Sequence, residues 1–572
     1  MSASPTRPSS GRFEPTPRYA LERAVTTLGE RAASWVDVPL DDKVAYLRSI
    51  IRRTMTAAPA LIRESLEAKG IPPSMAGEEW VAGPLSVVRT VRFLAETLQS
   101  IERTGRTPVP ERRIKRRRSG QVTVGVLPAD RWDRVLYPGW TADVWMDPEV
   151  ERRDARRHMG AYHTKPETAR TGVALTLGAG NVSSIVALDI VDKLFAGGEV
   201  VIAKFSPVND YVGPHLESAF ADLIADGFVR TVYGGEDVGG HLAHHSAIGS
   251  VHITGGVASH DRLVFGDGED GARRKQRNEP ILTKPVTSEL GNVSPVIVVP
   301  GEWKTRELRY QAEHVATQMV QNAGFNCNAA KVLVAHRGWP QREAFLDEVR
   351  SVLRSYPVRP AYYPGAEDAF ERFLAAYPAA ELLGERGPGI VPPTVAMVDA
   401  GPDEPAFGDE VFCSVMAVTD LPGGGPAEFL ERAVLFCNDQ LAGSLNATLV
   451  IDPTTEKALG PAVDDAIAGL RYGAVGVNVW AAAAFPLGVT TWGAFPGHTP
   501  DDIQSGVGVV HNARLIDRPQ KSVVRAPFFQ FPKPAWFVTH RRAAATLRRA
   551  TAFEADPGVG KLPGLLAAAV RQ

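Results

Sequence analysis

The chain has 572 residues, 44% of them hydrophobic, and its 63 Lys and Arg nearly balance its 65 Asp and Glu to give a net charge of −2. A chain of this length buries large cores and divides into more than one domain, and its near-neutral charge excludes a global attraction to nucleic acid or to an anionic membrane. Three cysteines are too few for a disulfide framework, and no apolar run approaches the ~18 residues of a membrane helix. We therefore expect a cytoplasmic protein with neither a membrane nor a nucleic-acid partner.

The N-terminal part of the sequence is predicted to be a short tail followed by helices. Residues 1–16 are rich in Ser, Pro and Arg, which is typical of a flexible tail. Residues 17–105 repeat apolar residues at spacings of three and four, which predicts amphipathic helices. Asp41 and Asp42 are the candidate N-terminal caps of the helix that begins near VAYLRSIIRR.

Two unusual segments follow these helices. The basic run at 111–118 (ERRIKRRR) contains no interleaved aromatic residues, so a solvated face is favoured over a DNA-binding site. Residues 121–146 alternate β-forming residues with Pro, Asp and Gly, which predicts a hairpin-like arm that serves assembly.

From residue 172 the pattern changes to alternating strands and helices. GVALTL predicts a buried strand, VSSIVALDIVDKLFAGG a helix and EVVIAK a second strand, and the alternation continues to HITGG. Such βαβ units form a parallel sheet that binds nucleotides at the carboxyl ends of its strands. Gly178 and Gly180 occupy the first two positions of a GxGxxG pattern, but Ser183 occupies the third, so glycines that only make tight turns are an alternative. The second strand ends in Lys204, a cation that tolerates a phosphate, where an acidic residue is usual.

The cysteine at position 327 differs from the other two in its surroundings. Residues 311–322 predict an amphipathic helix that Gly324 terminates, which leaves Cys327 in a turn that a substrate can reach. Cys413 and Cys437 lie within apolar runs and are typical of core thiols. Most free cysteines are inert, so further motifs must distinguish a nucleophile from a buried thiol.

The segment KPVTSELGNVSPVIVV places Glu289 on a turn before a strand, and Cys327 follows 38 residues later in GFNC. These two motifs resemble the glutamate and cysteine motifs of the aldehyde dehydrogenase superfamily. LGAGNVSS around Asn181 and VVIAKFSP around Lys204 precede them in the family's order, and DEVFCSV, with Glu410, follows. The resemblance spans about 120–535 and is that of a divergent, bacterial-type member.

The resemblance implies a role for each matched residue. Cys327 would be the nucleophile, Glu289 the base, and the Asn181 amide an oxyanion-hole donor. No metal site is implied. The residues implied to bind NAD or NADP are Gly178, Gly180, Lys204, Ser206, Thr254, Gly255, Gly256, Glu410 and Phe412.

The implied fold is α/β and aldehyde dehydrogenase-like, with a Rossmann-type cofactor domain, an α/β catalytic domain and a β assembly arm. The helices and the dinucleotide-binding domain would occupy 17–288, the catalytic domain 289–511, and a C-terminal arm and tail 512–572. Because KSVVRAPFFQFPKPAWFVTH is too apolar to leave exposed, we expect a homodimer or homotetramer.

The implied function is the NAD(P)-dependent oxidation of an aldehyde to a carboxylic acid through a cysteine thiohemiacetal and thioester. Two alternatives stay open: a CoA-acylating aldehyde dehydrogenase or acyl-CoA reductase, and a non-catalytic binding or assembly protein. Pro207 stands where the family often has Glu, so NAD and NADP are not distinguished.

The charged stretch 266–280 is expected to be a surface loop beside the cofactor cleft. Four aromatic residues are candidates to line a substrate tunnel, and packing in the core is the alternative. They are Trp480, Phe485, Trp492 and Phe495.

Overall fold

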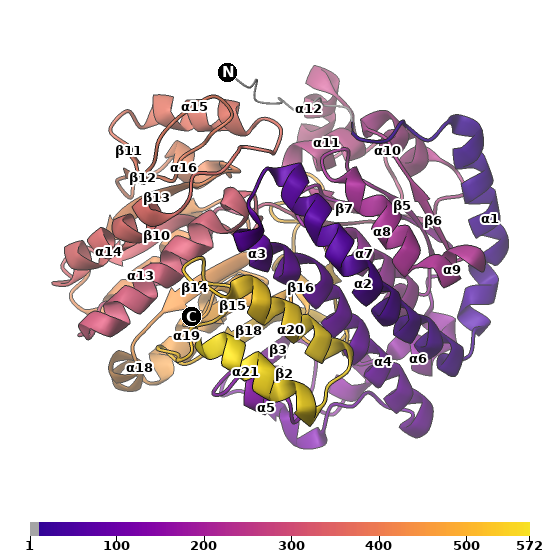
Figure 1. Ribbon diagram of the computed structural model, residues 1–572, viewed down its shortest axis with the longest axis horizontal. Coiled ribbons are helices and arrows are strands. Elements are labelled where there is room, and N and C mark those ends of the chain that lie inside the picture. Colours follow the sequence, from indigo (N-terminus) through magenta and orange to yellow (C-terminus); the bar gives the residue numbers. More distant parts are fainter. Residues whose placement is uncertain (1–10, 572) are drawn as a thin grey trace.

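The computed structural model describes residues 11–571, so most of the predicted tail at 1–16 lies outside the described residues. Two large sheets organise the chain (Figure 1). The first is a parallel five-stranded sheet in the order β6-β5-β4-β7-β8. Its strands are β4 (Val173–Leu177), β5 (Val200–Lys204), β6 (Val229–Val232), β7 (Ser250–Gly255) and β8 (Val286–Leu290). The α/β alternation predicted from residue 172 is therefore confirmed.

The second sheet has eleven strands in the order β1-β2-β3-β18-β15-β14-β9-β10-β13-β12-β11, and its centre from β18 to β12 is parallel. The segment predicted as an arm supplies β2 and β3, an antiparallel pair that joins the sheet through β18. The strands are β1 (Ile114–Arg116), β2 (Val122–Leu127), β3 (Thr141–Met146), β9 (Ser294–Val298), β10 (Ala330–His336), β11 (Glu381–Leu382), β12 (Thr394–Met397), β13 (Val415–Leu421), β14 (Asn446–Val450), β15 (Ala474–Val477) and β18 (Pro519–Arg525).

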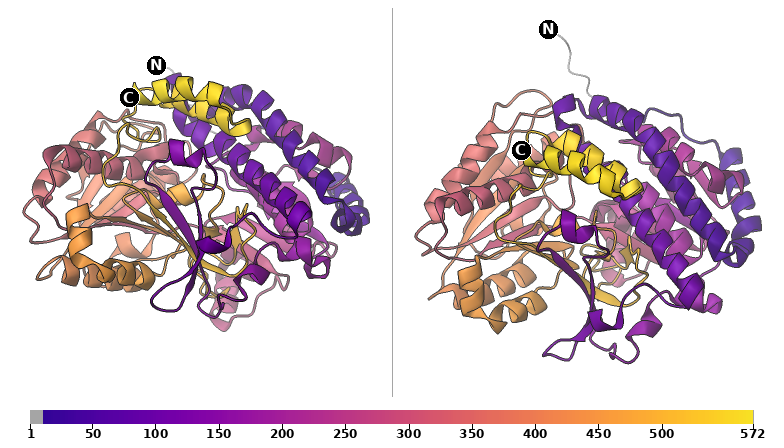
Figure 2. Two further views of the ribbon diagram at one scale, coloured as in Figure 1. Left: turned by 90° about the horizontal axis from the view of Figure 1, so that it is seen from below. Right: turned by 60° about the horizontal axis from the view of Figure 1, so that its bottom comes forward.

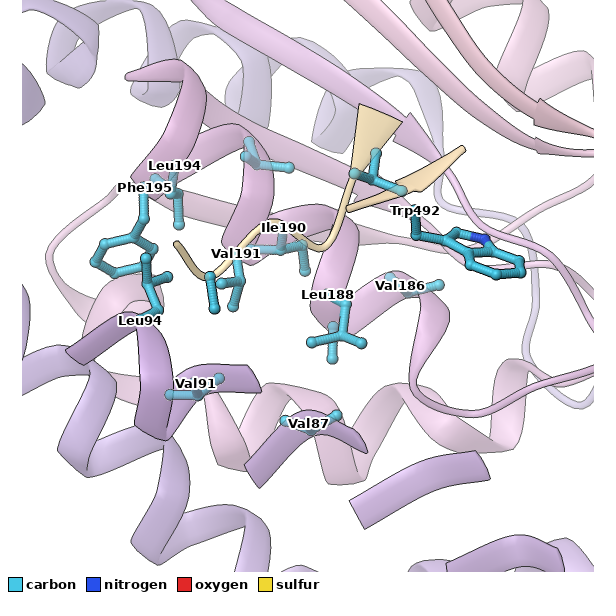
Figure 3. Packing of buried hydrophobic residues seen from close by; sticks show 14 of the residues in the cluster. Val87, Val91, Leu94, Val186, Leu188, Ile190, Val191, Leu194, Phe195 and Trp492 are labelled. Carbon is cyan, nitrogen blue, oxygen red and sulfur yellow. The ribbon is translucent and has the colours of Figure 1, made fainter. Parts of the chain in front are cut away.

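The predicted N-terminal helices are α1 (Arg18–Asp37), α2 (Leu40–Lys69), α3 (Ala76–Trp80) and α4 (Ser86–Thr104). Figure 3 shows Val87, Val91 and Leu94 of α4 beside the aliphatic side chains of α7 (Ile185–Asp192). This packing buries the apolar face that the periodicity predicts, and it attaches the helices to the five-stranded sheet.

The prediction that Asp41 and Asp42 cap a helix was wrong. The helix α2 begins at Leu40 after Pro39, so both aspartates lie inside its first turn. They interact there with the positive end of the helix dipole instead of accepting a capping hydrogen bond.

The prediction of a loop at 266–280 was also wrong, because α12 (Gly268–Arg277) occupies this stretch. Acidic Glu269 and Asp270 lie in its first turn and basic Arg274, Lys275 and Arg277 in its last. This order of charges favours a helix through the dipole, which outweighs the low apolar content.

Two C-terminal helices lie across the front of the molecule between the N-terminal helices and the larger sheet (Figures 1 and 2). They are α20 (Ala543–Ala555) and α21 (Leu562–Val570). A Cβ placed on Gly77 of α3 would lie 2.7 Å from Cβ of Ala543, so glycine permits the close approach of α3 and α20. Across residues 11–571, no helix has both the length and the hydrophobicity needed to cross a membrane.

Further helices pack around the two sheets, and most of them are labelled in Figure 1. They include α8 (Gly213–Ala219), α10 (Glu236–His244), α11 (Val257–Phe265), α13 (Thr305–Val320), α14 (Arg342–Ser355), α15 (Ala366–Ala376), α17 (Pro426–Gln440) and α19 (Pro461–Gly469).

Candidate active site

Cys327 lies in a tight loop between the helix α13 and the strand β10. Three consecutive residues of this loop have left-handed backbone conformations: Asn322 and Ala323 at φ 55° and Gly324 at φ 74°. A Cβ on Gly324 would lie 2.5 Å from the carbonyl carbon of Cys413. The sharp turn therefore requires glycine at this position and holds the thiol away from the axis of the helix.

The loop is anchored by a buried polar network from distant parts of the chain. The side-chain amide of Asn181 donates to the carbonyl of Phe325 at 3.2 Å. The Lys69 ammonium, at the end of α2, donates to Oδ1 of Asn322 at 3.0 Å and pairs with Glu79 at 2.7 Å. These charge-assisted contacts in a region excluded from water fix the loop, and with it Cys327.

The Cys327 thiol is partly buried and accepts a contact from Nδ2 of Asn328 at 3.4 Å. Burial raises its pKa well above the usual range, and the carboxyl groups of Glu289 and Glu410 raise it further. The resting thiol is therefore protonated at neutral pH, and it needs a neighbouring base to become a nucleophile.

Glu289, the predicted base, is the carboxyl group that interacts with this thiol. It lies near the end of β8 with only 2% of its surface exposed, and its Oε1 has no hydrogen-bond partner among residues 11–571. Burial raises its pKa to about 7, while hydrogen bonding with Cys327 opposes the shift. A carboxyl group with this pKa exchanges protons readily near neutral pH.

The residues predicted to bind the phosphates and ribose meet at the carboxyl ends of β4 and β5. A Cβ on Gly178 would lie 2.1 Å from Val186, and one on Gly180 would lie 2.5 Å from Val208. Lys204 ends β5, donates to the carbonyl of Gly234 at 3.0 Å, and has its pKa lowered to about 8 by burial.

Four further predicted residues lie along this edge of the sheet. Ser206 lies two residues beyond β5, and its hydroxyl accepts from the backbone of Val208 at 3.3 Å. In the next strand, Thr254 and Gly255 end β7, and Gly256 follows them with open space on its Cβ side. Thr254 lies opposite Glu289 in the parallel pair β7 and β8, so the predicted cofactor-binding edge and the predicted base are adjacent.

Glu410 and Phe412 lie on the other side of the cysteine loop. A Cβ on Gly291 would lie 1.7 Å from Oε2 of Glu410, so the carboxylate rests on the backbone just beyond Glu289. Burial raises the pKa of Glu410 to about 8, against the opposing effect of Lys331. The Phe412 ring lies 6.0 Å from Phe325.

The structure also places a polar network beside Glu289 that sequence reasoning missed. Asp189 of α7 lies 3.3 Å from Nε2 of His511 and 3.6 Å from Nε2 of His252, and all three are buried. Burial raises the pKa of Asp189 to about 8, lowers that of His511 to about 4 and lowers that of His252 well below its usual range, so the three groups are mostly uncharged at neutral pH. Single polar residues within apolar runs, as in VALDIV and SVHITG, were the available signal.

A cavity of about 510 Å³ begins at Cys327 and Glu289 and extends to the C-terminal helices. Of the four predicted tunnel aromatics, Trp480 and Phe485 line it. Trp492 lies behind Phe485 at 5.8 Å, and Phe495 lies 5.2 Å from Lys521, so neither is part of the wall.

The overall architecture is that of solved aldehyde-oxidising enzymes. The NADP-complexed glyceraldehyde-3-phosphate dehydrogenase from Bacillus halodurans superposes with a TM-score of 0.58 at 16% identity, over 89% of this chain and 91% of that one. The betaine aldehyde dehydrogenase from Staphylococcus aureus, in complex with NAD⁺, gives a TM-score of 0.61 at 14% identity, over 90% and 89%.

Sequence comparisons agree with the fold. The model of the aldehyde dehydrogenase family matches residues 152–369. The chain is 25% identical to the aminoacetaldehyde dehydrogenase of Pseudomonas aeruginosa, over 37% of this chain and 41% of that protein. It is 25% identical to the coniferyl aldehyde dehydrogenase of a Pseudomonas species, over 48% and 56%. The match thus spans about half the length of these curated relatives. The chain thus resembles the aldehyde dehydrogenase family over residues 152–369 in sequence, and aldehyde dehydrogenase structures over most of its length in fold.

Proposed function

We propose that the protein oxidises an aldehyde to a carboxylic acid with NAD or NADP. The observation that carries this proposal is the pairing of Cys327 and Glu289 at the inner end of one cavity, where the carboxyl group has an oxygen without a partner among the described residues and a pKa near 7. A protonated thiol beside a poised base is the arrangement that nucleophilic catalysis requires.

Each step of the proposed reaction uses a group in this arrangement. Glu289 takes the proton of Cys327, and the sulfur adds to the aldehyde carbonyl to form a thiohemiacetal. The Asn181 amide and the backbone N–H of Cys327 are the proposed donors to the oxyanion, each worth about 3 kcal/mol where such donors have been measured. Loss of hydride leaves a thioester, and Glu289 releases the thiol's proton to solvent. The carboxylate then takes a proton from the water that attacks the thioester, which expels the acid and the Cys327 thiolate, and the proton returns from Glu289 to the sulfur.

The residues at the edge of the cofactor sheet fit a dinucleotide. Gly178 and Gly180 form the tight turn after β4, where any Cβ would collide with Val186 or Val208, and Lys204 supplies a cation at the end of β5, where a ribose or phosphate would lie. Glu410, with an Oε1 that has no partner in the described chain, is the proposed ligand of the nicotinamide ribose. When bound, NAD or NADP supplies the hydride acceptor. Pro207, after Lys204, favours neither cofactor.

Hydrolysis is favoured over transfer to CoA because a CoA thiol does not require a base that activates water, and Glu289 is placed beside the sulfur. A non-catalytic role does not account for a buried carboxyl group held with an unsatisfied oxygen, which costs stability.

We also propose a cytoplasmic homodimer or homotetramer, on the family resemblance. The apolar segment 521–540 is not separate support for an oligomer, because Val523, Phe528 and Phe537 are buried within the chain. Sedimentation at micromolar concentration tests the assembly, and a species with the mass of a single chain would contradict it.

The proposed activity is tested by the absorbance of reduced nicotinamide, with NAD or NADP and a panel of aliphatic and aromatic aldehydes. We expect turnover without CoA, and a loss of at least about 10⁴-fold in Cys327→Ala with cofactor affinity retained. Turnover only with CoA would establish the acylating enzyme instead. Cofactor binding without turnover of any aldehyde would contradict the proposal.

A further inference from the structure

The cavity is lined mainly by apolar side chains along its whole length. Beyond Cys327 it is walled by Trp480 and Phe485, by the segment Pro527–Trp536, and by α20 and α21. Its volume of about 510 Å³ lies within the range of sites that bury a ligand of drug size, and a small aldehyde of two or three carbons would leave most of it unfilled.

Part of the cavity wall is apolar and exposed to solvent. Four large hydrophobic side chains of the wall, which we call the apolar rim, are exposed: Val135 at 44%, Phe529 at 37%, Phe531 at 69% and Leu566 at 41%. Exposed apolar residues that line one cavity mark a binding site, whereas single exposed residues need no explanation.

The charged side chains of the wall are already paired, apart from the catalytic base. In the part of the chain that the structure describes, only Glu289, Lys533 and Glu554 bring a charge to the cavity. Lys533 pairs with Glu313 at 2.6 Å. Glu554 pairs with Arg89 and Arg92, each at 2.5 Å. A phosphate, carboxylate or ammonium group on a substrate would therefore enter without a counter-ion, which is costly in an apolar site.

We propose that the preferred substrate is an aldehyde with a long, uncharged, apolar tail, which extends from Cys327 beneath α20 and α21 to the rim. This inference rests on the proposed function, because it places the reacting carbonyl at Cys327. It excludes as good substrates both the short aldehydes and those that carry a charged group at the far end. The rim residue Leu566 is a specificity-determining residue on this assignment.

The first test is a series of unbranched aldehydes from ethanal to decanal, with 4-oxobutanoate and 3-aminopropanal as charged members. Each methylene that enters the cavity contributes about 0.8 kcal/mol, so kcat/KM should rise about three- to fourfold per carbon until the tail reaches the rim. A flat series, or a charged aldehyde preferred over pentanal, would overturn the proposal.

The second test uses Leu566→Asp, with Val570→Asp as its matched control. Val570 is on the same helix and 51% exposed, but it is not part of the cavity wall. We expect the ratio of kcat/KM for decanal to that for propanal to fall about tenfold in Leu566→Asp and to be unchanged in Val570→Asp. Equal ratios in both variants would show that the tail does not reach α21.

A binding measurement separates this proposal from the proposed function. In Cys327→Ala, 1-decanol should quench or shift the tryptophan fluorescence, since Trp140, Trp480 and Trp536 line the cavity, whereas hexane-1,6-diol should bind at least tenfold more weakly. Decanol binding without oxidation of any aldehyde would leave the apolar site and refute the reaction. Oxidation of short aldehydes without decanol binding would support the reaction and refute the apolar substrate site.

Discussion

Two glutamates face the same cavity, and their surroundings differ. Glu289, at the inner end, has an oxygen without a partner among residues 11–571 and a pKa raised to about 7 by burial. Glu554, on α20, has both oxygens bound by Arg89 and Arg92 at 2.5 Å. On the proposed function, the same kind of side chain serves chemistry where it has no counter-ion and structure where it is ion-paired. A carboxylate in an apolar cavity is therefore a candidate base only when its partners are also known.

The largest expected difference between the two glutamates is in turnover. Glu289→Gln should lower kcat by about 10²- to 10⁴-fold, because it removes the proton acceptor for the thiol and for water while preserving the shape of the side chain. Single-turnover absorbance should show whether a thioester accumulates. A variant with more than a tenth of the native kcat would remove Glu289 from the mechanism.

The raised pKa of Glu289 predicts how kcat/KM of the native protein depends on pH. Because the carboxylate is the active form and its pKa is about 7, the rate should rise about tenfold per pH unit below 7 and level off above it. Glu554→Gln should keep the rise of kcat/KM below pH 7, and Glu289→Gln should lose it. If both variants kept this rise, the titration would belong to another group.

The second difference is in stability. Glu554→Gln leaves Arg89 and Arg92 buried with a neutral partner, so we expect it to lower the free energy of unfolding by about 3 kcal/mol in urea titrations. Arg89 keeps its contact with Asp133 at 2.8 Å, which limits the loss. An unchanged midpoint would show that the ion network is dispensable.

The last effect has the opposite sign. The folded protein holds the proton of Glu289 more tightly than the unfolded chain does, so native stability should fall as pH rises from about 4.5 to 7 and then stay level. Glu289→Gln removes this loss, and should stabilise the protein by at most about 3 kcal/mol at pH 8 with little effect at pH 4. Destabilisation at pH 8 would contradict the view that the unpaired glutamate costs stability.

Local sequence patterns predicted the parallel sheet because runs such as GVALTL and EVVIAK are apolar throughout, as strands covered on both faces must be. Cys327 and Glu289 were predicted from short motifs whose order along the chain resembles the family. The structure then placed both on one cavity, which spacing alone does not establish.

The parts that were not predicted depend on contacts between distant segments. The network of Asp189, His252 and His511 joins residues up to 322 positions apart, and each looks like an isolated polar residue in the sequence. The wall of the cavity combines residues near 82, 327, 483 and 566, so neither its length nor the pairing of Glu554 has a local signature. The helix α12 was missed because charge order, rather than apolar periodicity, favours it.

The anchoring of the cysteine loop limits what can be moved between scaffolds. Residues 321–328 carry the proposed nucleophile, but their contacts lead to Lys69 and Glu78 near the N-terminus and to Asn181. A graft of this octapeptide into another protein would leave those anchors behind, and its three left-handed residues would relax to more favourable conformations. The reactive centre is thus a property of the assembled chain and not a portable motif.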